Sequence, residues 1–162
     1  MSTEIERKFV LPSVPDFGRP PLAGARRLAI EQTYLFADDG TRERVRQVRE
    51  EGQPERYFHT RKRRISALTR EEDEREIERD EYERLLARRD PERGTIRKTR
   101  HVFLYGNRLF ELDVFEHPSG VVLLEVELPS EDAPVELPPF DGLREVSGDE
   151  RYSNAELARQ AV

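Results

Sequence analysis

The chain has 162 residues, of which 38% are charged and 35% hydrophobic, and its formal net charge is −6. It contains no cysteine, which excludes disulfides and thiolate metal sites, and its acidic excess disfavours a general nucleic-acid-binding protein. The three histidines lack zinc spacing and no apolar run is long enough to span a bilayer, so we expect one cytoplasmic domain covering residues 1–162.

The first predicted strand places three charged side chains on one face. Glu4, Glu6 and Lys8 alternate with Ile5 and Phe9. Because successive side chains of a strand point to opposite faces, the two carboxylates and the ammonium share one face. A single strand of this kind is typical of a half-buried sheet with a solvated outer face, so the pattern gains meaning only if other strands repeat it.

The next segments alternate in the same way and predict strands at 27–36, 41–48, 56–62 and 70–77. Residues 12–23 contain four prolines and predict a loop. The basic run Arg61–Arg64 fits a solvated strand end, or alternatively the entrance to a phosphate site. Residues 70–77 also suit a helix, but a better helix start follows, where Asp80 is followed three residues later by Glu83 as in a capping box.

The second half of the chain predicts strands at 95–104, 109–115 and 121–128, with a short strand at 143–147. The helix that starts at Asp80 should end near Asp90, before Pro91. Residues 105–108 predict a hairpin turn. Ser153, with Glu156 three residues on, predicts the cap of a final helix.

Across the predicted strands, alternate positions carry charge, and the sign depends on the strand. The acidic positions are Glu4, Glu6, Glu72, Glu74, Glu111, Asp113, Glu125 and Glu127. The basic positions are Lys8, Arg42, Arg44, Arg46, Lys62, Arg70, Lys98 and Arg100. The opposite faces of these strands are apolar only in part. A sheet that is polar on both faces cannot be stabilised by packing against a hydrophobic core.

A closed barrel accommodates this pattern. We expect an α+β fold, mainly antiparallel β, in which eight strands close around a wet lumen and leave no free edge. The apolar backs of the first, seventh and eighth strands should pack under the two helices. Carboxylates in the lumen repel one another unless a cation lies among them, and the basic cluster requires an anion. Mg²⁺ or Mn²⁺ together with a polyphosphate satisfies both.

The ordered set of motifs resembles the CYTH superfamily, the triphosphate tunnel metalloenzymes, over nearly the whole chain. The strongest match is Glu4-Ile5-Glu6-Arg7-Lys8-Phe9, the ExExK signature of that superfamily. Further matches are Gln32–Leu35, Arg44–Arg46, Thr60–Lys62, Arg70–Glu74, Lys98–Arg100, Phe110–Phe115, Glu125–Glu127, Glu145–Ser147 and Tyr152–Asn154. Ser147 stands where the superfamily commonly has threonine, so the hydroxyl is kept.

The resemblance implies an eight-stranded tunnel and a set of site residues. The metal ligands it implies are Glu4, Glu6, Glu125 and Glu127, with Asp113 as a further candidate. The phosphate ligands it implies are Lys8, Arg44, Arg46, Lys62, Lys98 and Arg100. Among these residues, Glu4, Glu6, Glu127 and Lys8 are the expected catalytic groups. The resemblance does not fix a role for Glu72 and Glu74.

The expected activity is metal-dependent hydrolysis of inorganic tripolyphosphate, with nucleoside and thiamine triphosphates as further substrates. The alternatives are a class IV adenylate cyclase that makes cyclic AMP from ATP, a polyphosphate-binding module without turnover, and an ordinary β domain with a charged surface. We expect a small-molecule polyphosphate as the partner, no nucleic acid and no membrane, and a monomer or homodimer.

Overall fold

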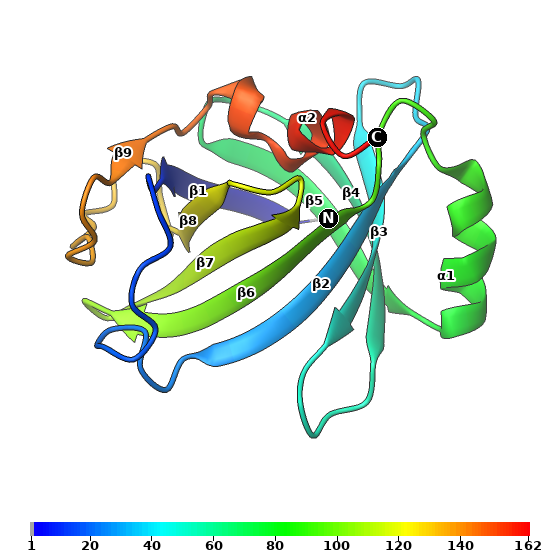
Figure 1. Cartoon of the computed structure of the whole chain (residues 1–162). Helices are drawn as coiled ribbons and strands as arrows, with labels where there is room; N and C mark the ends of the chain where they lie inside the picture. The colour runs from blue at the N-terminus through cyan, green and yellow to red at the C-terminus, as the bar shows by residue number, and fades with distance from the viewer. Residues whose placement is uncertain (1) are drawn as a thin grey trace.

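The computed structural model describes residues 2–162 and shows eight antiparallel strands closed into a barrel (Figure 1). The strands are β1 (Ser2–Val10), β2 (Arg26–Leu35), β3 (Arg42–Arg49), β4 (Arg56–Arg64), β5 (Thr69–Ile77), β6 (Ile96–Tyr105), β7 (Arg108–His117) and β8 (Val122–Glu127). Their order around the barrel is β5-β4-β3-β2-β6-β7-β8-β1, and pairing of β1 with β5 closes it. The expected eight-stranded tunnel is therefore confirmed.

Alternation of side chains explains why these segments form strands. Residues 69–77 form β5, so the strand prediction is correct there, although the segment is charged enough for a helix. In the hairpin between β6 and β7, Gly106 and Asn107 have φ values of 54° and 62°. Positive φ at both central turn residues is what a two-residue hairpin with the natural strand twist requires.

Short helices and one further strand complete the chain: α1 (Arg79–Leu85), η1 (Leu86–Arg88), β9 (Arg144–Glu145), η2 (Glu150–Tyr152) and α2 (Asn154–Arg159). The short strand β9 pairs with the end of β1. Within residues 2–162, no helix combines the length and apolar character needed to cross a membrane.

Of the two helix caps predicted from the sequence, one is wrong and one is confirmed. Asp80 is not the N-cap of α1; Glu78 holds that position without a side-chain hydrogen bond, and Asp80 lies in the first turn. A carboxylate in the first turn is favoured by the helix dipole, which produces the same sequence signal as a cap. Ser153 does cap α2, because its Oγ accepts a hydrogen bond from the Glu156 backbone N–H at 3.1 Å.

Loops, rather than helices, cover the apolar backs of β1, β7 and β8. Phe9, Phe110 and Leu124 form a buried cluster with Leu22 and Phe140, which come from the two long connections after β1 and β8. The expectation that the two helices pack there is wrong. The apolar residues in these connections lack strand or helix periodicity, so pattern analysis does not detect their packing role.

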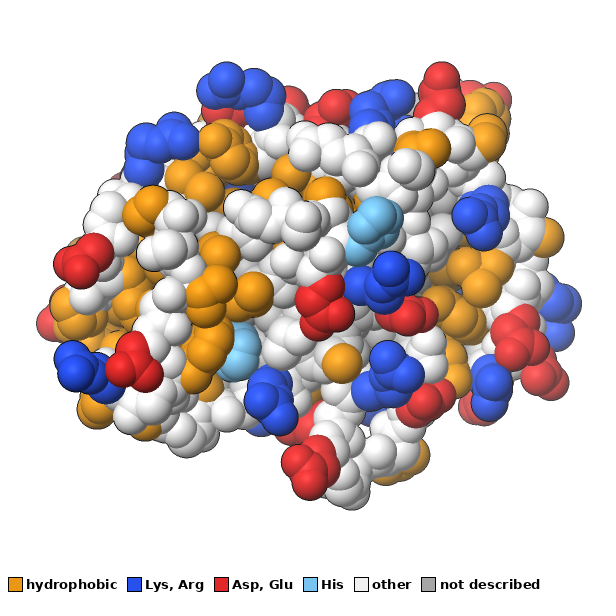
Figure 2. All heavy atoms as spheres, in the orientation of Figure 1, with side chains coloured by type: hydrophobic (Ala, Val, Ile, Leu, Met, Phe, Trp, Pro, Cys, Tyr) orange, Lys and Arg blue, Asp and Glu red, His pale blue; other side chains and the backbone are white. Residues whose placement is uncertain are grey.

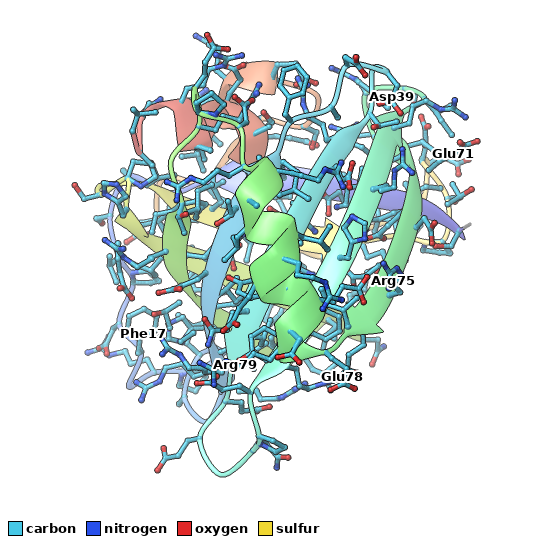
Figure 3. All side chains as sticks on the ribbon, turned by 90° about the vertical axis from the view of Figure 1, so that its right-hand side faces the viewer. Phe17, Asp39, Glu71, Arg75, Glu78 and Arg79 are labelled. Atoms are coloured by element: carbon cyan, nitrogen blue, oxygen red, sulfur yellow. The ribbon has the colours of Figure 1, made fainter. Side chains whose placement is uncertain are left out.

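Each helix instead packs elsewhere on the barrel. Helix α1 lies across the outer wall, where Tyr82 packs with Val45 and Tyr57 (Figure 3). Helix α2 lies over one mouth of the barrel, where Ala158 packs with Ile96 and other apolar residues (Figure 1). On the face shown in Figure 2, positive and negative side chains are interspersed over the outer surface. On this face, charge is not sorted by sign as it is in the interior.

Candidate active site

The barrel encloses a cavity of about 750 Å³ beneath α2. Seven of the eight acidic positions predicted to share the inner face line it, and all eight of the basic positions do. The acidic residue that does not line the cavity is Asp113. The alternating charge in the sequence therefore marks the lumen of the barrel.

One wall of the cavity is acidic. Glu6 lies directly opposite Glu127 where β1 pairs with β8, and Glu111 lies opposite Glu125 where β7 pairs with β8. Like charges on directly opposed strand positions destabilise a sheet. Burial and the neighbouring Glu125 carboxylate raise the pKa of Glu6 to about 8. Burial also raises the pKa of Glu111 and Glu127, so ionisation of this wall is disfavoured unless a cation lies beside it.

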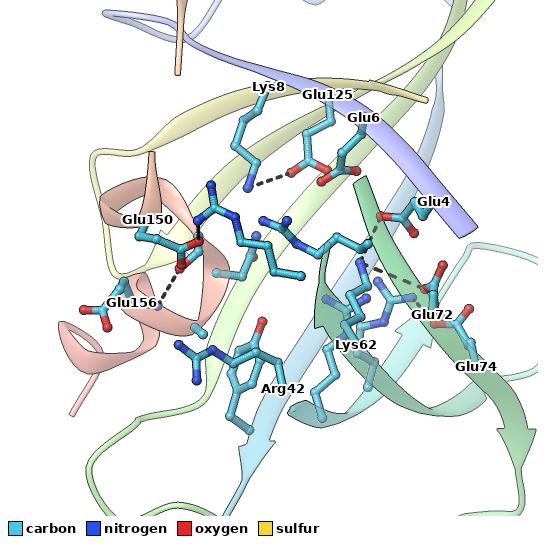
Figure 4. Close-up of a pocket in the computed structure, with 18 of the residues that line it drawn as sticks. Glu4, Glu6, Lys8, Arg42, Lys62, Glu72, Glu74, Glu125, Glu150 and Glu156 are labelled. Carbon is cyan, nitrogen blue, oxygen red and sulfur yellow. Dashed lines mark hydrogen bonds and ion pairs between the residues drawn. The ribbon is translucent and has the colours of Figure 1, made fainter. Parts of the chain in front are cut away.

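A mixed group of charges lies next to this wall. The Lys62 ammonium donates to Glu4 Oε1 at 3.1 Å and lies 4.0 Å from Glu72 Oε1 (Figure 4). Burial opposes ionisation of Glu4, but a hydrogen bond from Glu72 and the charge of Lys62 outweigh it and lower the pKa of Glu4 to about 2. Burial and the hydrogen bond to Glu4 raise the pKa of Glu72 to about 7. Below about pH 7, Glu72 thus holds the proton, and Glu4 is ionised.

The opposite wall of the cavity is basic. Strand β3 carries Arg44 and Arg46. Around the closed barrel it lies four strands from β8 in either direction, so it faces Glu125 and Glu127 across the lumen. Within the part of the chain that the structure describes, the buried Nε atoms of Arg44 and Arg46 have no hydrogen-bond partner. Burial and the Arg44 guanidinium lower the pKa of Arg46 to about 10. Guanidinium groups that repel one another and have free donors form a binding site for an anion.

Lys8 lies at the junction between the walls. Its Nζ is 3.7 Å from Glu125 Oε1 and donates to the Tyr152 carbonyl at 3.1 Å (Figure 4). Burial disfavours the ammonium, but the Glu125 and Glu6 carboxylates outweigh burial and raise the pKa of Lys8. Ser147, at the position where the superfamily has threonine, accepts a hydrogen bond from the Lys8 backbone N–H at 2.9 Å. Lys8 is therefore held as a fixed positive charge.

Asp113 is placed behind the basic wall rather than in the cavity. Its side chain is 1% exposed, and both of its oxygens accept hydrogen bonds from Arg100, at 2.8 and 3.0 Å. The Lys98 ammonium lies 2.9 Å from Asp113 Oδ2. The charges of Arg100 and Lys98 hold the pKa of Asp113 well below its usual range despite burial. Every Asp113 oxygen is thus committed to a cation of the protein.

The structure adds residues at the mouth of the cavity to which no role was assigned. Asn154, at the start of α2, accepts from Lys98 Nζ at 2.9 Å and from Gln32 Nε2 at 3.3 Å. The motif Tyr152–Asn154 belongs to the superfamily resemblance, but its chemistry depends on α2 folding back over the barrel. Arg64 also lines the cavity and pairs with Glu150.

The sequence left two alternatives for the basic run Arg61–Arg64, a solvated strand end or the entrance to a phosphate site. The structure supports each of them for part of the run. Arg61 and Arg63 pair with Asp39 and Glu71 on exposed surface. Arg64, which has the opposite strand parity to Arg63, faces the cavity mouth. The run is therefore in part a solvated strand end and in part the rim of the site.

The acidic wall suits a hard divalent cation. Within residues 2–162, no three histidine, cysteine or acidic side chains are already gathered closely enough to hold a metal ion. Magnesium, however, keeps several waters and is bound by one or two carboxylates together with substrate phosphates. Opposed carboxylates such as Glu6 and Glu127, whose pKa values are raised by burial and by neighbouring carboxylates, fit this kind of ligation.

Comparison with known proteins gives a consistent result. No family model matches the chain. The chain is 38% identical over 161 residues to the inorganic triphosphatase of Nitrosomonas europaea, covering 96% of this chain and 97% of that protein. It is 32% identical over 160 residues to the inorganic triphosphatase of Acetivibrio thermocellus, covering 98% and 95%.

Solved structures show the same likeness. The crystal structure of an inorganic triphosphatase superposes with a TM-score of 0.62 at 35% sequence identity. The match covers 98% of this chain and 96% of that one. The likeness therefore spans both chains almost completely.

Proposed function

This chain belongs to the CYTH superfamily, among its inorganic triphosphatases, and from that premise we propose that it hydrolyses inorganic tripolyphosphate between the two charged walls. The observation that carries the proposal is the opposition of carboxylates on β1 and β8 to guanidinium groups on β3 across one enclosed cavity. A polyanion alone would be repelled by the first wall, and a cation alone by the second. A metal-bound polyphosphate is attracted by both.

The basic wall would bind the phosphate oxygens. Arg44 and Arg46 present donors that no described residue uses, and each hydrogen bond to a charged group contributes about 1.5–3 kcal/mol. Lys98 and Lys62 add ammonium groups as point charges. Burial lowers the pKa of Lys98 to about 8, so an anion beside it would also stabilise its protonated form.

The acidic wall would hold Mg²⁺ or Mn²⁺ through Glu6, Glu125 and Glu127, with Glu4 beside them. When bound, the metal would neutralise charge on the phosphate oxygens. These oxygens would then repel the wall carboxylates and the oxygen of the attacking water less strongly. The carboxylate ligands must be ionised, so metal binding would release the proton that Glu6 otherwise keeps.

Hydrolysis requires water to attack one terminal phosphorus in line with the bridging oxygen. We assign Glu127, on the acidic wall, to accept a hydrogen bond from that water and to receive its proton. The new bond joins the water oxygen to phosphorus, and the P–O bridge breaks with its electron pair remaining on pyrophosphate. Lys8, a fixed cation within the lumen, stabilises the charge that develops on the departing oxygen.

Product analysis tests the proposal. Purified protein is incubated with tripolyphosphate and with ATP, each with Mg²⁺, Mn²⁺ or Ca²⁺, and the products are separated. We expect orthophosphate and pyrophosphate in equal amounts from tripolyphosphate. Cyclic AMP and pyrophosphate from ATP would identify a cyclase instead, and saturable binding of tripolyphosphate without products would identify a binding module.

A further inference from the structure

A second cavity opens at the other end of the barrel from α2. It has a volume of about 460 Å³ and is lined by the inner faces of β2, β3 and β4 and by the turn that joins β3 to β4. We call it the hairpin-side cavity. The sequence analysis does not predict it, because its lining combines arginines with apolar residues such as Leu28, Val48 and Phe58.

Two arginines belong to both cavities. Arg46 and Arg100 line the hairpin-side cavity and the main cavity, so these two side chains lie at the boundary between the two spaces. Arg100 is fixed by Asp113 and pairs with Glu111 at 2.9 Å, and Arg46 donates to Glu74 at 3.0 Å while its Nε has no partner among residues 2–162. A phosphoryl group between them would therefore be bound from both sides and would lie at the boundary.

The arginines of the hairpin-side cavity become more exposed to solvent outward. Its outer arginines, Arg26 and Arg56, are already paired with Glu50 at 2.7 Å and with Glu76 at 2.8 Å. Its inner arginines are also paired, Arg46 with Glu74 and Arg100 with Asp113 and Glu111, but they are buried. A phosphate that moves outward therefore passes from buried cations to cations that water screens, and the intervening side chains of Leu28 and Val48 offer no hydrogen bonds that would retain it.

We propose that the hairpin-side cavity is the exit for orthophosphate, an inference that rests on the proposed triphosphatase function. The terminal phosphoryl group held at Arg46 and Arg100 is the one cleaved, so pyrophosphate lies between the orthophosphate and the mouth beneath α2. Leaving toward that mouth requires the orthophosphate to pass another anion. Leaving past Leu28 and Val48 does not, so the two products separate in opposite directions.

The absence of cysteine from the sequence allows the exit to be blocked at a chosen position. Leu28→Cys places the sole thiol in the hairpin-side cavity, and Ala29→Cys places it on the outer face of the same strand. Each protein is labelled with a bulky reagent that forms a disulfide and is removed by dithiothreitol. Bond cleavage is followed by acid quench in a single turnover, and free orthophosphate by a fluorescent phosphate reporter.

We expect the label on Leu28→Cys to leave the cleavage rate unchanged and to slow orthophosphate release at least about tenfold, so that release limits turnover. Dithiothreitol should restore the rate, and labelled Ala29→Cys should behave like unlabelled protein. Val48→Cys, at another position in the cavity, serves as a second variant.

Unchanged release with complete labelling of both cavity variants would overturn the exit and leave the hydrolysis intact. An equal fall in cleavage and release would also overturn it, because the cavity would then serve substrate binding. Absence of tripolyphosphate hydrolysis by the unlabelled variants and by the unsubstituted protein would refute the proposed function itself, which separates the two failures.

Discussion

Asp113 accepts two hydrogen bonds from Arg100, and the same carboxylate pairs with Lys98 at 2.9 Å in a site where Asp113 is 1% exposed. This carboxylate is not available to a metal without release of two cations that the proposed function needs. We therefore assign Asp113 to positioning two phosphate ligands, although the sequence resemblance makes it a metal candidate.

Asp113→Asn should destabilise the fold and weaken substrate binding together. Removing one partner of a buried ion pair leaves uncompensated charge and costs about 3–5 kcal/mol. The free energy of unfolding by urea and the KM for tripolyphosphate measure the two effects. Asp16→Asn, which breaks an exposed pair with Arg19, is the control and should change neither. A metal affinity that falls in Asp113→Asn without change in stability would restore the role of metal ligand.

Glu6 should make the stability of the metal-free protein depend on pH. The folded protein keeps the Glu6 proton up to a pKa of about 8, whereas the ordinary value is 4.5. Between these values the folded state binds more protons than the unfolded state, so stability falls as pH rises. Glu6→Gln should remove this part of the fall, as judged by the difference in urea midpoint between the two proteins from pH 5 to 8. Parallel curves for the two proteins would contradict the raised pKa.

Glu4→Gln and Glu6→Gln should each abolish metal-dependent turnover while the fold survives, because a neutral amide replaces a carboxylate on the side of the lumen assigned to the metal. Orthophosphate release with Mg²⁺ and with Mn²⁺ measures the loss, and circular dichroism checks the fold. Glu71→Gln is the matched control, since Glu71 lies on the same strand as Glu72 but pairs with Arg63 on the outer surface. Full activity in both Glu4→Gln and Glu6→Gln would refute the metal assignment.

Arg44→Ala and Arg46→Ala should weaken tripolyphosphate binding strongly. The loss of one hydrogen-bonded charge, about 1.5–3 kcal/mol, corresponds to roughly a 10- to 150-fold rise in the dissociation constant. Calorimetric titration measures it. Arg88→Ala provides the comparison, because Arg88 pairs with Glu43 on the outside of the barrel. Losses no greater than that of Arg88→Ala would mean that the two arginines do not hold substrate.

Gly94→Ala should loosen α2. An added Cβ would lie 2.0 Å from the Ala161 carbonyl oxygen, and the Gly94 N–H donates to the Ala158 carbonyl. Overpacking of this kind costs about 1–3 kcal/mol. Because α2 carries Asn154, which bonds Lys98, both the melting temperature and tripolyphosphate affinity should fall. Gly18→Ala, where the nearest atom is an exposed side-chain oxygen at 3.2 Å, should leave both unchanged.

The sequence by itself determined the strands and the face that each turns inward, because side chains alternate with a period of two and charge falls on one parity. It therefore predicted that Glu6, Arg44 and the other alternating charges share one lumen. Only the tertiary structure decided which walls oppose one another, since strand order depends on pairing between distant segments. Only tertiary structure decided the depth of Asp113, which shares its parity with cavity residues and yet lies beneath Arg100 and Lys98. Cover by loops escapes the pattern because it depends on aperiodic residues such as Phe140. The hairpin-side cavity escapes it because inward positions there carry apolar residues such as Phe58 in place of charge.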